Sequence, residues 1–176
     1  NASYFLNLEL KSPSARRALG AAMTAIALAS AGEAQALTFT VNTTADTDDI
    51  APGDNMCLDA AGQCSLRSAL RELNANPSPG PHLIHLPAGT YTLTRDNNSG
   101  DDDTALWDDL DILTTAFVEI RGPSTGTATI TAAGLTPWGG RVIDVHPGAN
   151  VHLRQVELHG GSAVAHGGGV RARDAA

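Results

Sequence analysis

The sequence is poor in basic side chains. It contains 11 Lys and Arg residues against 19 Asp and Glu residues, which gives a formal net charge of −8 at pH 7. Proteins that bind nucleic-acid backbones need clustered Lys and Arg to neutralise the phosphates. This balance therefore argues against a nucleic-acid partner, and it suits an exported protein.

The sequence also lacks the motifs of several enzyme classes. It has no Gly-x-Ser-x-Gly elbow, no phosphate-binding loop and no His-Glu-x-x-His zinc motif. After residue 36, no apolar run is long enough to cross a bilayer. Residues 37–176 are therefore not expected to be transmembrane, and none of these three signatures assigns a reaction.

The one long apolar run lies near the start of the chain. Two arginines, Arg16 and Arg17, precede residues 18–31, which are rich in Ala, Leu, Ile and Met, and an Ala-Gln-Ala sequence follows at residues 34–36. This order is typical of a secretory signal peptide. A buried alanine-rich helix is the alternative. We predict that residues 1–36 are an upstream segment with a signal peptide, and that the mature protein is secreted or held at the cell surface.

Short stretches of alternating apolar and polar residues fill the C-terminal half. Residues 142–145 and 151–153 alternate with period two, and a new alternation starts in 156–158 with its phase shifted by one. A bend at residues 154–155 would let the apolar side chains on both sides of it face inward. Similar stretches occur upstream, in residues 110–112, 117–122 and 127–131, with glycines at the expected corners.

Each of these short strands is too small to bury its own apolar face, so the strands must stack in repeating turns. The sequence therefore predicts an all-β fold, a right-handed parallel β-helix, with residues 82–176 forming its first turns. We expect the chain to be truncated at the C-terminus, because no cap follows the last turn. A β-sandwich is the competing fold.

Residues 37–81 are predicted to form a cap at the N-terminal end of this coil. Residues 37–41 alternate as a strand, and Ser65 can cap a short helix whose apolar stripe would rest on the first turn. The only two cysteines, Cys57 and Cys64, most simply form a disulfide in an exported protein. A metal site or a redox pair is the alternative use of these two side chains.

One segment of this cap carries a family resemblance. Residues 53–70, GDNMCLDAAGQCSLRSAL, resemble the signature of the CSLREA-motif bacterial surface proteins. Residues 84–93 are similar to the strand-turn-strand that follows the motif, and residues 167–170 resemble its glycine-rich turn ends. The resemblance implies bacterial export and a disulfide and short helix that open a right-handed parallel β-helix of the pectate-lyase-like kind. Ser68 stands where the family usually has Glu, and Leu73 where Ala is usual.

Two loops are rich in aspartate, the ligand type that calcium prefers. Residues 43–55 hold four Asp residues without the spacing of an EF-hand. Residues 96–109 are denser still, and the calcium ligands that they could offer are Asp101, Asp103, Asp108 and Asp109. We predict that both are solvated acidic loops, and a calcium site is the alternative for each. No other cofactor is expected.

Candidate catalytic residues exist but form no recognisable pair. A polysaccharide lyase or glycosidase on such a coil would need carboxylates or a basic group at defined separation, and the alternative candidates are Asp144, Arg154 and Glu157. Four histidines, at positions 146, 152, 159 and 166, could be metal ligands or exposed polar side chains. Their steps of six or seven residues distribute them around the coil, which favours exposed polar positions.

The sequence therefore predicts an exported structural or adhesive module, with glycans or surface proteins as partners and no evident catalytic site. The alternative function is that of a polysaccharide lyase or glycoside hydrolase with the same fold.

Overall fold

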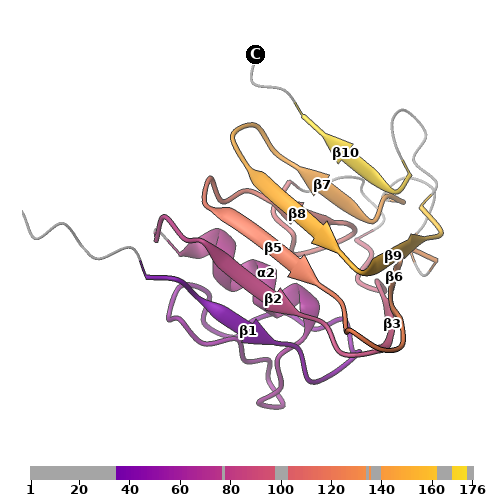
Figure 1. The fold of residues 1–176 in the computed structure, drawn as a ribbon, viewed down its shortest axis with the longest axis horizontal. Helices are drawn as coiled ribbons and strands as arrows, with labels where there is room; N and C mark the ends of the chain where they lie inside the picture. Colours follow the sequence, from indigo (N-terminus) through magenta and orange to yellow (C-terminus); the bar gives the residue numbers. More distant parts are fainter. Residues whose placement is uncertain are drawn as a thin grey trace, which may run out of the picture. The chain divides into compact units, whose positions relative to one another are not determined.

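Ten short strands and one helix are formed by residues 35–76, 78–97, 103–133, 135, 140–161 and 168–173, which are the residues that the computed structural model describes (Figure 1). The predicted upstream segment lies outside these residues except for Gln35 and Ala36. The described residues all belong to one compact unit, Ala34–Ala176.

The strands form three parallel sheets. Sheet A contains β1 (Thr38–Thr40), β2 (His82–His85), β5 (Phe117–Arg121) and β8 (Asn150–Arg154), which lie side by side in Figure 1. Sheet B contains β3 (Gly89–Thr92), β6 (Ala128–Thr131) and β9 (Val156–His159). Sheet C contains β4 (Leu110–Ile112), β7 (Ile143–Val145) and β10 (Val170–Ala172).

The chain visits these sheets in a fixed order. From β2 onward it passes through sheet A, sheet B and sheet C, and it repeats this order up to β10. Every strand pair in the described residues is parallel. The prediction of a predominantly β protein with one short helix is thus confirmed, and the antiparallel pairing of the competing β-sandwich is not found in the described strands.

The core consists of aliphatic side chains stacked from strand to strand. Ile84 of β2 is in register with Ile120 of β5, and Leu110 of β4 with Ile143 of β7. All four side chains are fully buried. Complete burial of a side chain of this size is worth about 1.5–3 kcal/mol. These rows form because alternation sends every second residue of each strand to the same side.

The corner between β8 and β9 is the bend that the sequence predicts. Gln155 has a φ of 54°, which interrupts the strand and reverses the phase of the alternation. The stacked corner below it contains Gly122, whose N–H donates to the Arg154 carbonyl at 2.8 Å. A Cβ atom on Gly122 would lie 1.8 Å from the Gln155 carbonyl oxygen. Only glycine therefore allows the two corners to stack this closely.

The helix α2 (Leu66–Ala75) begins with a capping box. The Ser65 hydroxyl accepts from the Ser68 N–H at 3.0 Å, and the Ser68 hydroxyl accepts from the Ser65 N–H at 2.8 Å. Ser68 thus performs the reciprocal capping that Glu or Gln commonly provides at this position. The apolar stripe of α2 is buried, with Ala69, Leu70 and Leu73 fully covered.

Asn74, near the end of α2, binds the edge of β4. Its side-chain Nδ2 donates to the Asp111 carbonyl at 2.8 Å, and its Oδ1 accepts from the Leu113 N–H at 2.9 Å. These are the two backbone groups that a neighbouring strand would otherwise pair. The amide of Asn74 therefore satisfies the edge of sheet C at the α2 side, where an open edge would invite pairing with another chain.

The predicted disulfide between Cys57 and Cys64 is present, with an S–S distance of 2.01 Å. It closes the loop that leads into α2. We expect the Cys57→Ser/Cys64→Ser variant to lose about 2.5 kcal/mol of unfolding free energy, because the open loop gains entropy in the unfolded chain. Urea unfolding of the oxidised protein and of the variant measures the difference, and equal midpoints would contradict the estimate.

A buried histidine makes stability depend on pH. His82 is 1% exposed; its Nδ1 accepts from the Leu37 N–H at 3.2 Å, and its Nε2 lies 3.2 Å from the Ser78 carbonyl. Burial lowers the pKa of His82 below 6.5, although the bond to Ser78 partly opposes the shift. The neutral form is therefore favoured in the folded state. Its stabilisation is complete above the unfolded pKa and is lost as the pH falls through the folded pKa.

We expect the unfolding free energy to fall between pH 7.5 and pH 5.5, by at most about 1.4 kcal/mol per pH unit from this one group. The His82→Gln variant should show a shallower slope. His159→Gln is the control, because the His159 side chain is 59% exposed. Identical slopes for wild type and His82→Gln would show that another group carries the dependence.

Candidate functional site

A row of charged side chains crosses sheet C. Asp111 of β4 is in register with Asp144 of β7, which is in register with Arg171 of β10. In each strand this residue lies between two apolar ones. Both carboxylates are nevertheless fully buried. Other parts of the chain must therefore cover this side of the sheet.

Asp144 is bound by three arginines. Arg171 Nε donates to Oδ1 at 2.9 Å, Arg173 Nε donates to Oδ2 at 2.9 Å, and the terminal nitrogens of both side chains also contact Oδ2. Arg141 Nη1 lies 3.5 Å from the same oxygen and 3.3 Å from Asp109 Oδ2. Carboxylates buried in this way are stable only when cations and hydrogen bonds surround them.

The second half of the aspartate-rich loop covers Asp111. The Ala105 N–H donates to Asp111 Oδ2 at 2.8 Å, and His146 Nε2 lies 2.7 Å from Asp111 Oδ1. Arg173 also forms an ion pair with Asp103. The prediction of a solvated loop is therefore wrong for Ala105, Asp108 and Asp109, which are buried, whereas the Asp103 side chain is 56% exposed. His146 is likewise partly buried, whereas it was predicted to be exposed.

Four residues of this cluster could offer ligand atoms to a cation. Asp103, Asp111, Asp144 and His146 each bring one such atom to within 4.8 Å of the others. Of the calcium ligands predicted from sequence, only Asp103 belongs to this group. Asp109 is paired with Arg141, Asp108 is buried, and Asp101 lies outside the described residues. The arginines already bound to Asp144 supply positive charge that a cation would otherwise provide.

Arg67 of α2 fastens the same loop from its other side. Its side chain is fully buried, and Nε donates to Asp46 Oδ1 at 2.6 Å. Its terminal nitrogens donate to four backbone carbonyls of the loop, those of Ala105, Trp107, Asp108 and Asp109, at 2.8–3.5 Å. One guanidinium group therefore joins α2, the loop after β1 and the loop before β4.

The first aspartate-rich loop is also structural. Asp46 accepts from the backbone N–H groups of Thr94 and Arg95 at 2.7 and 3.0 Å, in addition to its bond with Arg67. Asp49 is buried and accepts from the Ala51 and Leu58 N–H groups. Burial is the largest cause that raises the pKa of Asp49, and these two bonds partly oppose it. The prediction of a solvated loop is wrong for these two carboxylates.

The outer side of sheet A carries charged side chains that remain exposed. His85, Arg121 and Arg154 occupy one in-register row of β2, β5 and β8. The neighbouring row contains Glu119 and His152. Arg121 Nε donates to Glu119 Oε1 at 2.5 Å, and this bond is the largest cause that lowers the pKa of Glu119.

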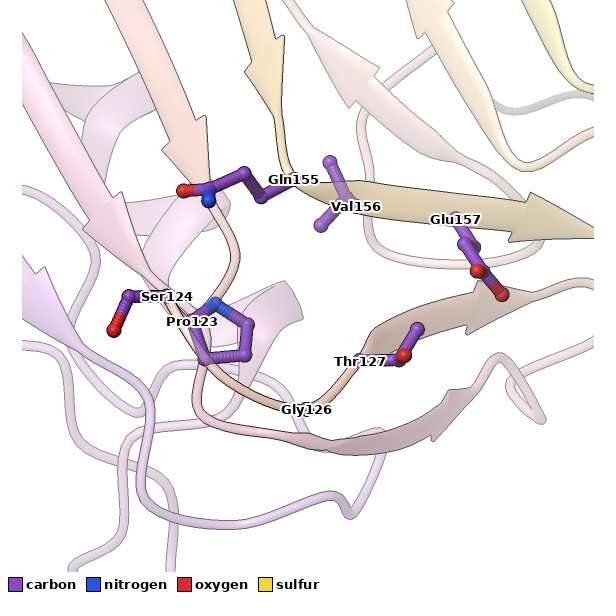
Figure 2. Close-up of a pocket in the computed structure, with 7 residues that line it drawn as sticks. All are labelled: Pro123, Ser124, Gly126, Thr127, Gln155, Val156 and Glu157. Atoms are coloured by element: carbon purple, nitrogen blue, oxygen red, sulfur yellow. The ribbon is translucent and has the colours of Figure 1, made fainter.

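A pocket of about 280 Å³ lies at the corner between sheets A and B (Figure 2). It lies where the turn after β5 stacks against the turn after β8. The lining is mixed, with hydroxyl, amide and carboxylate groups beside a small apolar floor: Pro123, Ser124, Gly126, Thr127, Gln155, Val156 and Glu157. In Figure 2 the sticks of Pro123, Ser124 and Thr127 come from the segment after β5, and those of Gln155, Val156 and Glu157 from the turn after β8 and the start of β9.

The three alternative catalytic candidates lie on three different sheets. Asp144 belongs to sheet C, Arg154 to sheet A and Glu157 to sheet B. Glu157 forms an ion pair with His159 at 3.4 Å, and both side chains are more than half exposed. His152 is also exposed, as predicted, whereas His166 lies outside the described residues. The topology does not bring the three candidates to one face.

Sequence reasoning missed the residues that bind most carboxylates and carbonyls, namely Arg67, Arg141, Arg171 and Arg173. Only Arg67 had a usable signal, because it occupies a fixed place in the motif of residues 53–70. Apart from the contact of Arg141 with Asp144, the partners of the other three are 27–70 positions away in the sequence, and no local pattern identifies contacts over such distances.

In comparisons with known proteins, the chain matches no protein-family model, no curated protein and no solved structure. In the described part of the chain, no helix combines the length and apolar character needed to cross a membrane.

Proposed function

We propose that this chain forms an exported right-handed parallel β-helix that serves as a structural or adhesive module and binds glycans or surface proteins. The repeated passage through three parallel sheets supports the coil, and the disulfide of Cys57 and Cys64 supports an oxidising compartment outside the cytoplasm. The resemblance of residues 53–70 to the CSLREA-motif bacterial surface proteins points the same way.

The observation that carries this proposal is that the buried carboxylates bind other segments of the chain. Asp46, Asp111 and Asp144 are held by arginines, by a histidine or by backbone N–H groups that join separate segments. A catalytic carboxylate must instead reach a substrate and exchange a proton with it. These buried groups fasten the coil, and the exposed polar rows of sheet A are left for partners.

Binding and turnover assays with the purified, oxidised chain test the proposal. A glycan array should show binding, and incubation with polyuronates and neutral polysaccharides, with and without calcium, should release no new reducing or unsaturated ends. Calcium-dependent cleavage that is lost in the Asp144→Asn or Arg154→Gln variant would instead establish the alternative, a polysaccharide lyase. Absence of binding to any glycan or surface protein would leave a purely structural module.

A further inference from the structure

We propose that the outer side of sheet A, together with the corner pocket beside it, binds an acidic polysaccharide that carries sulfate or carboxylate groups. This inference rests on the proposed function and names the ligand class. Two features carry it: a row of cationic side chains at strand spacing, and a polar pocket that begins where that row ends.

The cationic row is regular because the strands are in register. His85, Arg121 and Arg154 stand side by side on β2, β5 and β8, and neighbouring strands are about 4.8 Å apart. The side chains of Arg121 and Arg154 are 38% and 50% exposed. Arg121 Nε and Nη2 are bound to Glu119, so Arg154 is the more open of the two guanidinium groups, and both groups keep N–H donors that can reach anionic oxygens.

The local charge is opposite to that of the whole protein. Glu119 is the carboxylate that faces this row, and its side chain is 13% exposed. It lies 2.5 Å from Arg121, 3.8 Å from Arg154 and 3.9 Å from His152. One carboxylate thus faces two arginines, so the row keeps a positive surplus on a chain of net charge −8. Such a local surplus attracts anions while the rest of the surface repels them.

The pocket continues from the ends of the two strands that carry the arginines. Arg121 and Arg154 are the last residues of β5 and β8, and the pocket lining starts at Pro123 and Gln155 in the turns that follow. Its volume of about 280 Å³ is slightly below the ~300–1,000 Å³ of sites that hold a whole small molecule. Ser124, Thr127 and Gln155 offer neutral donors and acceptors, and the Glu157 carboxylate in the same lining can accept hydrogen bonds from sugar hydroxyls but would repel an anionic group. One uncharged sugar ring fits this chemistry, with its anionic neighbours in the polymer on the arginine row.

A glycan suits this face better than a nucleic acid. Duplex DNA carries one charge per about 1.7 Å of its axis and is held through many Lys and Arg contacts. The described part of sheet A offers two arginines and two histidines on an acidic protein. A polymer with sparser charges, separated by hydroxyl-rich rings, loses less to repulsion and can also fill the pocket.

The test compares dextran sulfate with uncharged dextran, and hyaluronan as the carboxylated polymer, by biolayer interferometry at low and high salt. We expect dextran sulfate and hyaluronan to bind, dextran not to bind, and binding to weaken as salt rises. Arg154→Gln should lower affinity about tenfold, the loss of one charge-assisted hydrogen bond. Ser124→Phe, which fills the pocket without changing the charge, should also lower affinity.

Arg71→Gln is the matched control, because it removes one positive charge from α2, where Arg71 is paired with Asp48 and stands apart from sheet A. Its affinity should stay within about twofold of wild type, since it only changes the net charge. Equal losses in Arg154→Gln and Arg71→Gln, tighter binding to a DNA duplex than to either polymer, or unchanged affinity in Ser124→Phe would each overturn the assignment.

The outcomes also separate this inference from the proposed function. Binding of a neutral glycan or a surface protein that is insensitive to Arg154→Gln would refute the acidic-polysaccharide site and leave the adhesive role intact. Cleavage of the bound polymer would refute the non-catalytic role while leaving the binding face in place.

Discussion

Replacement of Arg67 by alanine should cost about 3–5 kcal/mol of unfolding free energy, the range measured when one partner of a buried ion pair is removed. The substitution leaves Asp46 buried without its guanidinium partner, and it leaves four loop carbonyls without their donor. Arg67→Lys should recover only part of the loss, because an ammonium group has three donors and cannot reproduce the planar arrangement of the guanidinium. Urea unfolding with the disulfide intact measures both variants.

Arg71→Ala is the matched control for Arg67. Both residues lie on α2 and pair with an aspartate of the loop after β1, but the Arg71 and Asp48 side chains are 24% and 25% exposed. A partly exposed pair of this kind contributes less than about 1 kcal/mol. If Arg67→Ala and Arg71→Ala unfold at similar urea concentrations, Arg67 does not hold the two loops against α2. The contacts of Arg67 would then not stabilise the fold.

The strands of this protein could be predicted closely from the sequence. Alternation located seven of them to within one or two residues, and the phase shift after Leu153 predicted the bend that the positive φ of Gln155 produces. These features are local, because period-two alternation and glycine corners act within a few residues. β10 was missed, since Arg171 is followed by Ala172 and not by a second large apolar residue, so no clear alternation marks the strand.

Whether the charged side chains are buried or exposed could not be predicted in the same way. Asp144 lies between Ile143 and Val145, so its outward position was correctly inferred, but exposure did not follow from it. Its burial depends on Arg171 and Arg173, which reach it only because β10 pairs with β7 in one particular register. Register is decided by the stacking of whole turns, and a single sequence does not display it.

Arg67 and Arg71 show the same limit on a helix. Their spacing of four residues places them on one face of α2, and nothing in the local sequence distinguishes them. The structure buries Arg67 completely and leaves Arg71 partly exposed. The difference arises from the loop at residues 103–109, which folds over Arg67 and supplies its carbonyl partners.

The second large effect is expected for Asp144. Asp144→Asn should cost about 3 kcal/mol, the lower end of the range for a broken buried pair, because Arg171 and Arg173 keep 21% and 26% of their side chains exposed. The neutral amide leaves the arginines of the cluster repelling one another. Since two of these arginines belong to β10 or follow it, the loss should be local and should appear first as faster hydrogen exchange in Val170–Ala172.

Glu157→Gln serves as the control for Asp144, since it removes one carboxylate that is 58% exposed and should change stability by less than about 0.5 kcal/mol. Added calcium tests whether Asp144 is neutralised by the arginines or helps to bind a cation. If the arginines neutralise Asp144, added calcium leaves the wild-type melting temperature unchanged and does not rescue Asp144→Asn. A calcium-dependent rise in wild type that Asp144→Asn abolishes would mean that Asp103, Asp111, Asp144 and His146 hold a cation. In that case the arginines would have to move away from Asp144 when calcium binds.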